Sequence, residues 1–367
     1  MKPKIIFIIN SIQQQRCIKR IEEFIANGYE VEAYGFSRSE VIPTLPENFK
    51  IEVLAQFDNS VSYHKRLIIM YKALRPVFKR HQHEQVVYYY FLLDVALVCR
   101  MLSHKPYIYE ESDLMQTYIP SALVRNTLNW LDKRIIRHSL ITTMTSEGFA
   151  QFHYGTQYPD NIVFVPNKLN NKVLQLSYAP SSYDMNHLRI GFVGGARYQT
   201  VVNFVRTFAE HFPQHEFHFY GTILDFQQEF EQIIETHANV YYHGKFSNPA
   251  DLPAIYQNID LVLATYDTQF ENVRYAEPNK LYEAAYFQTP IIVSVGTFLA
   301  QRVQQLGIGW AVDAMNEKAI VKLINGLNDN DIASCVANCA ALDRQQLVNT
   351  NPLLFKKLDQ VWNSSLS

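Results

Sequence analysis

Short hydrophobic stretches rich in Ile, Val, Phe and Tyr recur along the chain, and a longer amphipathic stretch follows most of them. In the first half, this pattern predicts strands at residues 5–9, 30–35, 86–90, 107–109, 140–144 and 162–165. Apolar positions with helical spacing predict helices at residues 13–27, 63–80, 94–103 and 121–138. Strands that alternate with helices are typical of βαβ units, in which helices cover both faces of a parallel sheet.

A polar stretch without a period, residues 167–187, interrupts the alternation, and we interpret it as a linker. The alternation then resumes. Strands are predicted at 188–193, 216–220, 240–242, 261–264 and 291–295, and helices at 200–211, 226–237, 252–258, 279–287, 298–306 and 317–327.

The sequence therefore predicts an α/β protein with two Rossmann-like, doubly wound domains at residues 1–166 and 188–350. The C-terminal segment, residues 351–367, is expected to form a helix that starts near Pro352, and it is a candidate to pack back on the first domain. Ligands of such folds bind at the carboxyl ends of the strands, so a central cleft between the domains is the expected site.

Composition and charge narrow the class of protein. Hydrophobic residues make up 48% and charged residues 19%, which excludes an intrinsically disordered chain. The net charge of −2 gives no global basic field, so nucleic acid is not an expected partner. The apolar run at residues 5–9 is too short for a signal peptide, and no run approaches the ~18–20 residues of a membrane span. A cytoplasmic protein is expected.

The four cysteines are interpreted as structural thiols of a reducing cytosol. Cys335 and Cys339 are spaced as neighbours on one helix face, but they lack the second pair or the histidines that a zinc site needs.

The second domain opens on a strand that ends in two glycines, Gly194 and Gly195, followed by Arg197 and a helix. Glycines let backbone N–H groups approach a ligand closely, and a helix N-terminus favours an anion. An arginine beside them can bind phosphate oxygens in a bidentate manner. The segment is a candidate phosphate cradle, and a tight turn with a surface arginine is the alternative.

A second candidate is Pro278-Asn279-Lys280-Leu281-Tyr282-Glu283, which precedes a predicted buried strand. Pro278 suits the first turn of a helix, so Lys280 and Glu283 fall three residues apart on one face. Lys280 could neutralise a diphosphate, and Glu283 could accept hydrogen bonds from ribose hydroxyls. A salt bridge on a solvated helix explains the same spacing, and spacing alone favours it.

Three acids, Glu110, Glu111 and Asp113, end a predicted strand of the first domain. A loop there would face the cleft, where a carboxylate could orient or deprotonate an acceptor hydroxyl, and Asp113 is the best single candidate. The alternative is a helix cap at Asp113. The polar first loop, with Asn10 and Arg16, is expected to line the same acceptor side.

Residues 64–80 carry six lysines and arginines and no acid, interleaved with large apolar residues. A basic amphipathic helix can lie on an anionic membrane, which makes such a surface a candidate partner and the inner membrane face a candidate location. The ordinary alternative is a helix that faces the core and has a basic solvent face. Pro76 would bend or end this helix.

An ordered series of motifs resembles the donor domain of family 4 glycosyltransferases of the GT-B fold. The series covers about residues 188–312 and comprises Gly194-Gly195-Ala196-Arg197, Phe219-Tyr220-Gly221, Tyr242-His243-Gly244, Asp260-Leu261-Val262-Leu263, Pro278-Asn279-Lys280-Leu281-Tyr282-Glu283 and Thr289-Pro290-Ile291-Ile292. Three segments resemble the acceptor domain more loosely: Tyr109-Glu110-Glu111-Ser112-Asp113, Thr145-Ser146-Glu147-Gly148-Phe149 and Val165-Pro166-Asn167.

The resemblance implies a donor site made of the glycine turn, two turns that flank the nucleotide, and the start of a helix. Its expected residues are Gly194, Gly195, Arg197, Tyr220, Gly221, His243, Gly244, Pro278, Lys280 and Glu283. In these roles Arg197 and Lys280 would hold the nucleotide diphosphate, and Glu283 the ribose.

Two positions depart from the pattern of the family. The first glutamate of its Glu-x7-Glu pair would stand at Tyr275, and Glu277 is only six residues before Glu283. A lysine that many members carry after the glycine turn would stand at Val202. The diphosphate site would then have two cations rather than three.

The expected activity is transfer of a sugar from a nucleotide-diphosphate sugar to an acceptor hydroxyl, with no metal or other cofactor. The resemblance implies a retaining reaction, with Arg197, Lys280 and Asp113 as the catalytic residues, and a glycan or lipid-linked glycan as acceptor in polysaccharide synthesis. Two alternatives stay open: a sugar-nucleotide epimerase of the same architecture, and a non-catalytic partner subunit. A Rossmann dehydrogenase is poorly supported, because the first strand leads into Asn10 without a Gly-x-Gly-x-x-Gly motif.

Overall fold

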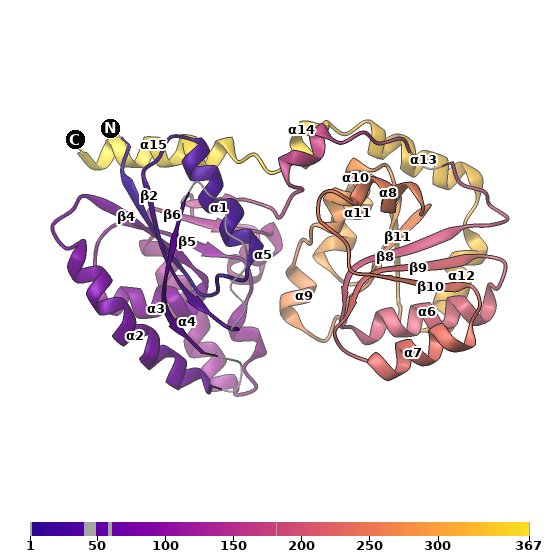
Figure 1. The fold of residues 1–367 in the computed structure, drawn as a ribbon, viewed down its shortest axis with the longest axis horizontal. Helices are drawn as coiled ribbons and strands as arrows, with labels where there is room; N and C mark the ends of the chain where they lie inside the picture. The colour runs from indigo at the N-terminus through magenta and orange to yellow at the C-terminus, as the bar shows by residue number, and fades with distance from the viewer. Residues whose placement is uncertain (1, 40–48, 58–60, 181, 367) are drawn as a thin grey trace. The chain divides into compact units, whose positions relative to one another are not determined.

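The computed structural model describes residues 2–39, 49–57, 61–180 and 182–366. The chain divides into two compact units (Figure 1): unit 1 comprises Met1–Pro166 and Asn351–Ser367, and unit 2 comprises Asn167–Thr350. Each unit is built on one parallel sheet. Among the described helices, none combines the length and the apolar composition needed to cross a membrane.

The sheet of unit 1 has seven strands in the order β3-β2-β1-β4-β5-β6-β7. Their bounds are β1 Lys4–Ile9, β2 Val31–Ser37, β3 Ile51–Gln56, β4 Val86–Phe91, β5 Tyr107–Glu111, β6 Ile141–Met144 and β7 Ile162–Phe164. The strand order reverses between β1 and β4, so the carboxyl ends of these two strands flank the point where such folds bind ligands.

Helices cover both faces of this sheet. Helices α1 (Gln15–Ala26) and α15 (Pro352–Leu366) pack on one face, whereas α2 (Tyr63–Arg80), α3 (Leu92–Leu102) and α4 (Ala122–His138) lie side by side on the other (Figure 1). The 3₁₀ helix η1 (Met115–Tyr118) and helix α5 (Glu147–Tyr154) follow β5 and β6.

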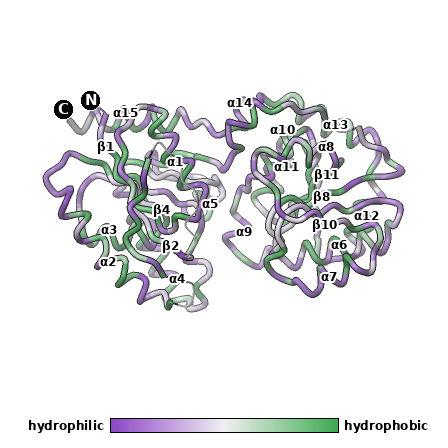
Figure 2. The backbone as a smooth tube through the Cα atoms, in the orientation of Figure 1, coloured by the Kyte–Doolittle hydropathy of each residue, from purple (hydrophilic) through white to green (hydrophobic). Residues whose placement is uncertain are grey.

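Because β4 is covered on both faces, it reads as one continuous apolar run with aromatic side chains on each side. Tyr89 stacks on Phe7 with ring centroids 4.7 Å apart, and Tyr88 packs against Phe78 of α2 on the other face. Figure 2 shows hydrophobic residues along the inner strands of both units. The aromatic side chains of β4 therefore belong to the core of unit 1 on both faces of its sheet.

The C-terminal helix α15 belongs to unit 1. Phe355 packs on Phe24 of α1, and Asp359 accepts a hydrogen bond of 2.7 Å from the hydroxyl of Tyr29. At the start of the helix, Asn351 donates to both carboxylate oxygens of Glu23 at 3.0 Å. The chain thus leaves unit 1 after its seventh strand and returns to it for the last helix.

The sheet of unit 2 has six strands in the order β10-β9-β8-β11-β12-β13. Their bounds are β8 Arg189–Ala196, β9 Glu216–Ile223, β10 Val240–Gly244, β11 Leu261–Ala264, β12 Ile291–Ser294 and β13 Gly309–Val312. Its helices are η2 Asn171–Gln175, α6 Gln199–His211, α7 Gln227–Thr236, α8 Leu252–Gln257, α9 Glu271–Tyr275, α10 Lys280–Tyr286, α11 Phe298–Leu306, α12 Glu317–Gly326, α13 Asp329–Ala340 and α14 Arg344–Leu347.

Two local expectations differ from the structure. The stretch interpreted as a linker, residues 167–187, is part of unit 2, because Leu169 and Val173 are buried in a core of that unit. Helix α2 continues through Pro76 to Arg80, since the exposed proline stands on the solvent side and only its missing N–H interrupts the helical hydrogen bonds. The expected cleft between the domains stays a prediction.

Candidate functional site

The glycine turn at the end of β8 is built by two strands that approach closely. Gly194 and Gly221 are partners across β8 and β9, and both have φ of +137°. A Cβ atom at Gly221 would lie 1.8 Å from the carbonyl oxygen of Gly194, so no other residue fits there without moving the backbone. Gly221 is thus explained by strand packing, and its expected place beside a nucleotide stays a prediction.

The structure brings both predicted cations to this turn. A Cβ atom placed on Gly194 would lie 3.8 Å from Nζ of Lys280, and one on Gly195 would lie 3.7 Å from an Nη atom of Arg197. Each cation therefore lies beside one glycine at the carboxyl end of β8, and the Leu224 side chain also lies against Gly195, with its Cδ1 atom 2.7 Å from that Cβ position. An ammonium and a guanidinium beside a glycine turn can bind phosphate oxygens.

Lys280 and Glu283 form a buried ion pair, with 2.9 Å between Nζ and Oε2. The hydroxyl of Tyr256 donates to Oε2 at 2.8 Å, and the amide of Asn279 donates to Oε1 at 2.7 Å. The salt bridge of the alternative interpretation is therefore present, but it is buried rather than solvated. Burial, followed by the nearby Glu283 carboxylate, raises the pKa of Tyr256 well above its ordinary value, so this hydroxyl stays a donor.

The N-terminus of α6, which follows the glycine turn, is already occupied by a carboxylate. Asp267 accepts hydrogen bonds from the backbone N–H groups of Gln199 at 3.1 Å and Thr200 at 2.9 Å. The expectation that this helix N-terminus binds an anion is therefore wrong, because a protein acid caps it. The only hint of this cap in the sequence is weak: Asp267 is an acid that follows shortly after the buried strand β11.

Tyr220 and His243 lie next to each other as stacked rings with centroids 4.2 Å apart. His243 Nε2 is also 3.0 Å from Nδ1 of His218, and burial lowers the pKa of both histidines. Gly244 ends strand β10 with φ of +74°. Their expected place beside a nucleotide stays a prediction.

The structure shows the surroundings of the residues at the two positions where the sequence departs from the glycosyltransferase pattern that it resembles. Glu277, the acid nearest to the position of the absent glutamate at Tyr275, is buried, pairs with Arg302 at 3.2 Å and accepts a hydrogen bond from Tyr282. Val202 is fully buried in the core beneath α6, where a lysine would have no solvent or phosphate to meet.

In unit 1, two of the predicted acceptor-side residues meet. Arg16, in the first turn of α1, pairs with Asp113 at 2.7 Å and also donates to the carbonyl oxygen of Ser112 at 3.4 Å. The Asp113 side chain is partly exposed, so it is the predicted acid that solvent and an acceptor can reach. Asn10, at the end of β1, is buried, and among the described residues its Oδ1 atom has no hydrogen-bond partner.

Glu110 and Glu111 are the last two residues of β5, so the strand extends beyond the predicted residues 107–109 and includes them before the loop begins. Both are buried. Glu110 pairs with Arg20 at 3.0 Å and accepts a hydrogen bond from Tyr89, and Glu111 lies 2.8 Å from Nε2 of His153. Buried carboxyl groups need such partners, and the expected place of both glutamates on the acceptor side stays a prediction.

Glu111, His153 and Asp132 form a buried cluster whose donor atoms lie within 4.8 Å of one another, a spacing that a metal ion could use. The Asp132 carboxylate accepts from Tyr109 at 2.9 Å and from Gln116 at 3.1 Å. Burial raises the pKa of Glu111 to about 8 and that of Asp132 well above its ordinary value. We interpret the cluster as a network neutralised by shared protons, and the expectation of no metal stays untested.

The sequence contains one Asp-x-Asp, Asp329-Asn330-Asp331, whose two carboxylates are of the type that divalent ions prefer as ligands. The structure places it in the first turn of α13, where Asn328 donates to the Asp331 carboxylate at 2.6 Å. We interpret these acids as residues that stabilise the first turn of α13.

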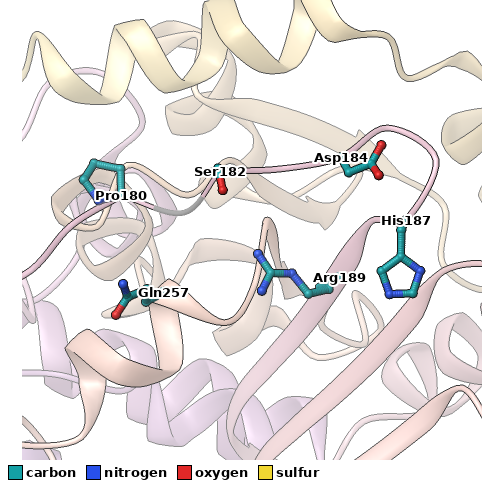
Figure 3. Close-up of a pocket in the computed structure, with 6 residues that line it drawn as sticks. All are labelled: Pro180, Ser182, Asp184, His187, Arg189 and Gln257. Carbon is teal, nitrogen blue, oxygen red and sulfur yellow. The ribbon is translucent and has the colours of Figure 1, made fainter.

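A pocket of about 400 Å³ lies at the beginning of β8. Figure 3 shows Arg189 at this pocket together with Ser182, Asp184 and His187. The Arg189 guanidinium pairs with Asp260 at 2.7 Å. Ligands of doubly wound folds bind at the carboxyl ends of strands, and this pocket is at the opposite end of β8 from Gly194. We therefore place the candidate donor site at the glycine turn.

No family model matches the sequence, and no curated protein matches it. The fold is similar to that of sucrose-phosphate synthase from Thermosynechococcus elongatus, with a TM-score of 0.71, 15% identity and 99% of each chain covered. It is also similar to Anabaena Alr3699/HepE in complex with UDP-glucose, with a TM-score of 0.68, 15% identity and 99% of each chain covered. The chain has the GT-B fold.

The lipopolysaccharide outer core galactosyltransferase WaaB in its apo form is a third GT-B structure of this kind, with a TM-score of 0.66, 14% identity and 99% of each chain covered. At these identities the similarity establishes the fold alone. Within this GT-B chain, the glycine turn, Lys280 and Glu283 all belong to unit 2, and the Arg16–Asp113 pair belongs to unit 1.

Proposed function

We propose that this protein is a glycosyltransferase that moves a sugar from a nucleotide-diphosphate sugar to an acceptor hydroxyl. The observation that carries the proposal is the position of Lys280 beside Gly194 and of Arg197 beside Gly195, at the carboxyl end of β8. The ammonium of Lys280 has three N–H donors and uses one on Glu283. It can therefore bind a phosphate oxygen while it stays paired.

In this proposal Lys280 and Arg197 stabilise the negative charge that develops on the departing diphosphate, so no metal ion is required for that step. Glu283 accepts a hydrogen bond from a ribose hydroxyl at the acceptor site that Lys280, Asn279 and Tyr256 leave available, since a carboxylate has about four such sites. Asp113, held by Arg16, orients the acceptor hydroxyl. We further propose that the reaction retains the anomeric configuration, as the family resemblance implies.

We propose a glycan or a lipid-linked glycan as acceptor, in capsular, exopolysaccharide or lipid-linked oligosaccharide synthesis. The similarity in fold to WaaB, a lipopolysaccharide galactosyltransferase, and to HepE with UDP-glucose supports a nucleotide-sugar donor and a surface-glycan acceptor. We also propose that the protein acts at the cytoplasmic face of a membrane.

The test uses the full chain and a panel of nucleotide sugars in a thermal-shift screen, followed by NMR of the donor that binds. Transfer to water is expected to release the sugar slowly, and the first anomer released reports whether configuration is retained. Formation of an epimer of the donor sugar would identify an epimerase. Binding without turnover in the presence of glycan acceptors would identify a non-catalytic subunit. The absence of any binding would refute the proposed site.

A further inference from the structure

Strand β13 forms one edge of the sheet of unit 2. Among the residues that the structure describes, β13 pairs with β12 and with no other strand. The carbonyl oxygens of Ile308 and Val312 accept hydrogen bonds of 3.0 Å from β12 and from the residue that follows it. Because successive residues of a strand direct their backbone groups to opposite sides, Gly309 and Ala311 direct their N–H and C=O groups away from β12.

The outward backbone groups of β13 belong to a groove of about 720 Å³. Gly309 and Ala311 both line this groove, and neither has a side chain large enough to cover its own backbone. Two residues of an extended strand are about 6.6 Å apart, at ~3.3 Å per residue. The groove therefore offers two sets of backbone donors and acceptors at the repeat of an extended polypeptide.

Two helices form the walls of this groove. Its lining includes Thr297, Ala300, Gln301 and Gln304 from α11 and its N-cap, and Asp331, Ser334, Cys335 and Asn338 from α13. In each set the positions follow the spacing i, i+3, i+4, i+7, so each helix turns one face to the groove. The Asn338 amide donates to the carbonyl oxygen of Gly307 at 2.8 Å, which fixes α13 beside the start of β13.

The wall formed by α13 indicates how long a segment the groove can hold. Asp331 and Asn338 are seven residues apart, which corresponds to about 10 Å at ~1.5 Å per helical residue. An extended chain advances ~3.3 Å per residue, so about three residues span this distance.

The groove carries a negative charge at the end opposite Asn338. Among the described residues that line the groove, Asp331 alone is charged, and it is exposed. Asn328 donates to the Asp331 carboxylate at 2.6 Å, which holds this side chain in place and leaves further acceptor sites for a ligand. A basic side chain is therefore favoured at this end, and uncharged side chains are favoured along the rest of the groove.

We propose that this groove binds an extended segment of a partner polypeptide as an additional strand beside β13. The segment is about three residues long and has a lysine or arginine at one end. Its backbone pairs with Gly309 and Ala311, its basic side chain pairs with Asp331, and its other side chains lie against α11 and α13. The inference does not rest on the proposed sugar transfer, because β11 and β12 separate β13 from the strand β8 that carries the glycine turn.

Complementarity of the backbone favours this occupant over the others. A polypeptide strand presents donors and acceptors at the same repeat as Gly309 and Ala311, whereas a compact small molecule has no such repeat. A second copy of the chain would have to insert its own β13. That strand is itself bounded by α11 and α13 of its own copy, so it cannot enter a groove with the same two walls.

The test selects binders of the full chain from a displayed library of random heptapeptides and measures the enriched peptides, synthesised with capped ends, by fluorescence anisotropy. Ala311→Pro should weaken their binding about tenfold, because proline removes an N–H group that faces the groove and is not bonded to β12. Asp331→Asn should weaken binding by up to about fivefold, as expected for an exposed ion pair. The matched control Asp329→Asn changes an exposed acid of the same helical turn that does not line the groove, and it should bind like the wild type.

A second readout needs no substitution in the protein. N-methylation of the peptide backbone should weaken binding to the wild type about tenfold, and saturating unmethylated peptide should slow hydrogen exchange at the amides of Gly309 and Ala311 at least about tenfold. Three results would each overturn the inference: no enriched peptide, equal binding after Ala311→Pro or after N-methylation, or a dimer of the chain that Ala311→Pro abolishes and that excludes the peptide. Sugar transfer to water should be unchanged in Ala311→Pro and Asp331→Asn, so failure here is separate from failure of the proposed reaction.

Discussion

Replacing Lys280 by methionine should separate a phosphate-binding role of this residue from a structural one. Methionine keeps most of the packing of the lysine stem and removes its charge. In the structure the ammonium pairs with Glu283 at 2.9 Å, and both side chains are buried. The substitution therefore removes one partner of a buried ion pair, and two consequences follow, one for stability and one for rate.

The stability cost follows from the environment of Glu283. Removing one partner of a buried pair costs about 3–5 kcal/mol, because the other charge stays buried. Glu283 keeps the donors Asn279 and Tyr256, so we expect the lower end, about 3 kcal/mol. In the double variant Lys280→Met/Glu283→Gln both charges are gone, and stability should return to within about 1 kcal/mol of the wild type, since replacing a whole buried pair is often neutral.

The reaction rate, unlike the stability, should not recover in the double variant. If Lys280 stabilises the departing diphosphate, its loss lowers kcat by about 10²–10³, and the double variant stays as slow because the cation is still absent. Glu283→Gln alone should mainly raise the donor KM, since ribose is bound equally before and during reaction. The assays are denaturant unfolding of each variant and steady-state kinetics at saturating donor. A double variant that regains both stability and kcat would refute the phosphate role, because the charge would then act only through the fold.

Three further predictions concern other parts of the molecule. Because burial raises the pKa of Glu111 from its ordinary 4.5 to about 8, the folded state keeps a proton that the unfolded state loses, so stability should fall by about 1 kcal/mol per pH unit between these values and level off above pH 8. Glu111→Gln should flatten this slope in urea unfolding followed at several pH values. Gly221→Ala should cost at least about 2 kcal/mol and abolish donor binding in a thermal-shift assay, because its Cβ would meet the Gly194 carbonyl oxygen at 1.8 Å, whereas Gly28→Ala, with open space around it, should leave binding intact. Asp113→Asn should lower kcat for transfer to a glycan acceptor but leave the donor Kd unchanged in calorimetry, and a changed Kd would contradict its place on the acceptor side.

The central strands could be predicted from the sequence because helices bury both of their faces. Strands such as β1 and β4 are almost wholly buried and therefore read as unbroken apolar runs. The edge strands β3 and β13 were not predicted, since most of their residues are at least partly exposed and the apolar signal is diluted. Helix α13 was missed for a related reason, because only three of its residues are buried.

The candidate site shows a different limit. The motif around Lys280 and Glu283 is local, so its spacing could be read directly. The burial of this ion pair could not be predicted from the motif, because Tyr256, whose hydroxyl donates to Glu283, is 27 residues away. The residue that caps α6 is even farther away in the sequence. Asp267 accepts a hydrogen bond from the backbone N–H group of Thr200, and the two residues are 67 positions apart. Pairing over such separations is decided by the packing of the whole unit.

Long-range pairing also decides which of the predicted acids can take part in chemistry. Glu110 is neutralised by Arg20, 90 residues away, and Glu277 by Arg302, 25 residues away, and both acids are buried. A carboxylate that is buried and matched in this way can bind a substrate only if it gives up its partner, which costs several kcal/mol. Asp113 differs because it is partly exposed. Glu283 is buried and matched like the other two, and its proposed contact with ribose rests on the acceptor site that Lys280, Asn279 and Tyr256 leave. Among the predicted acids that the structure describes, Asp113 therefore combines a fixed position with exposure to a ligand.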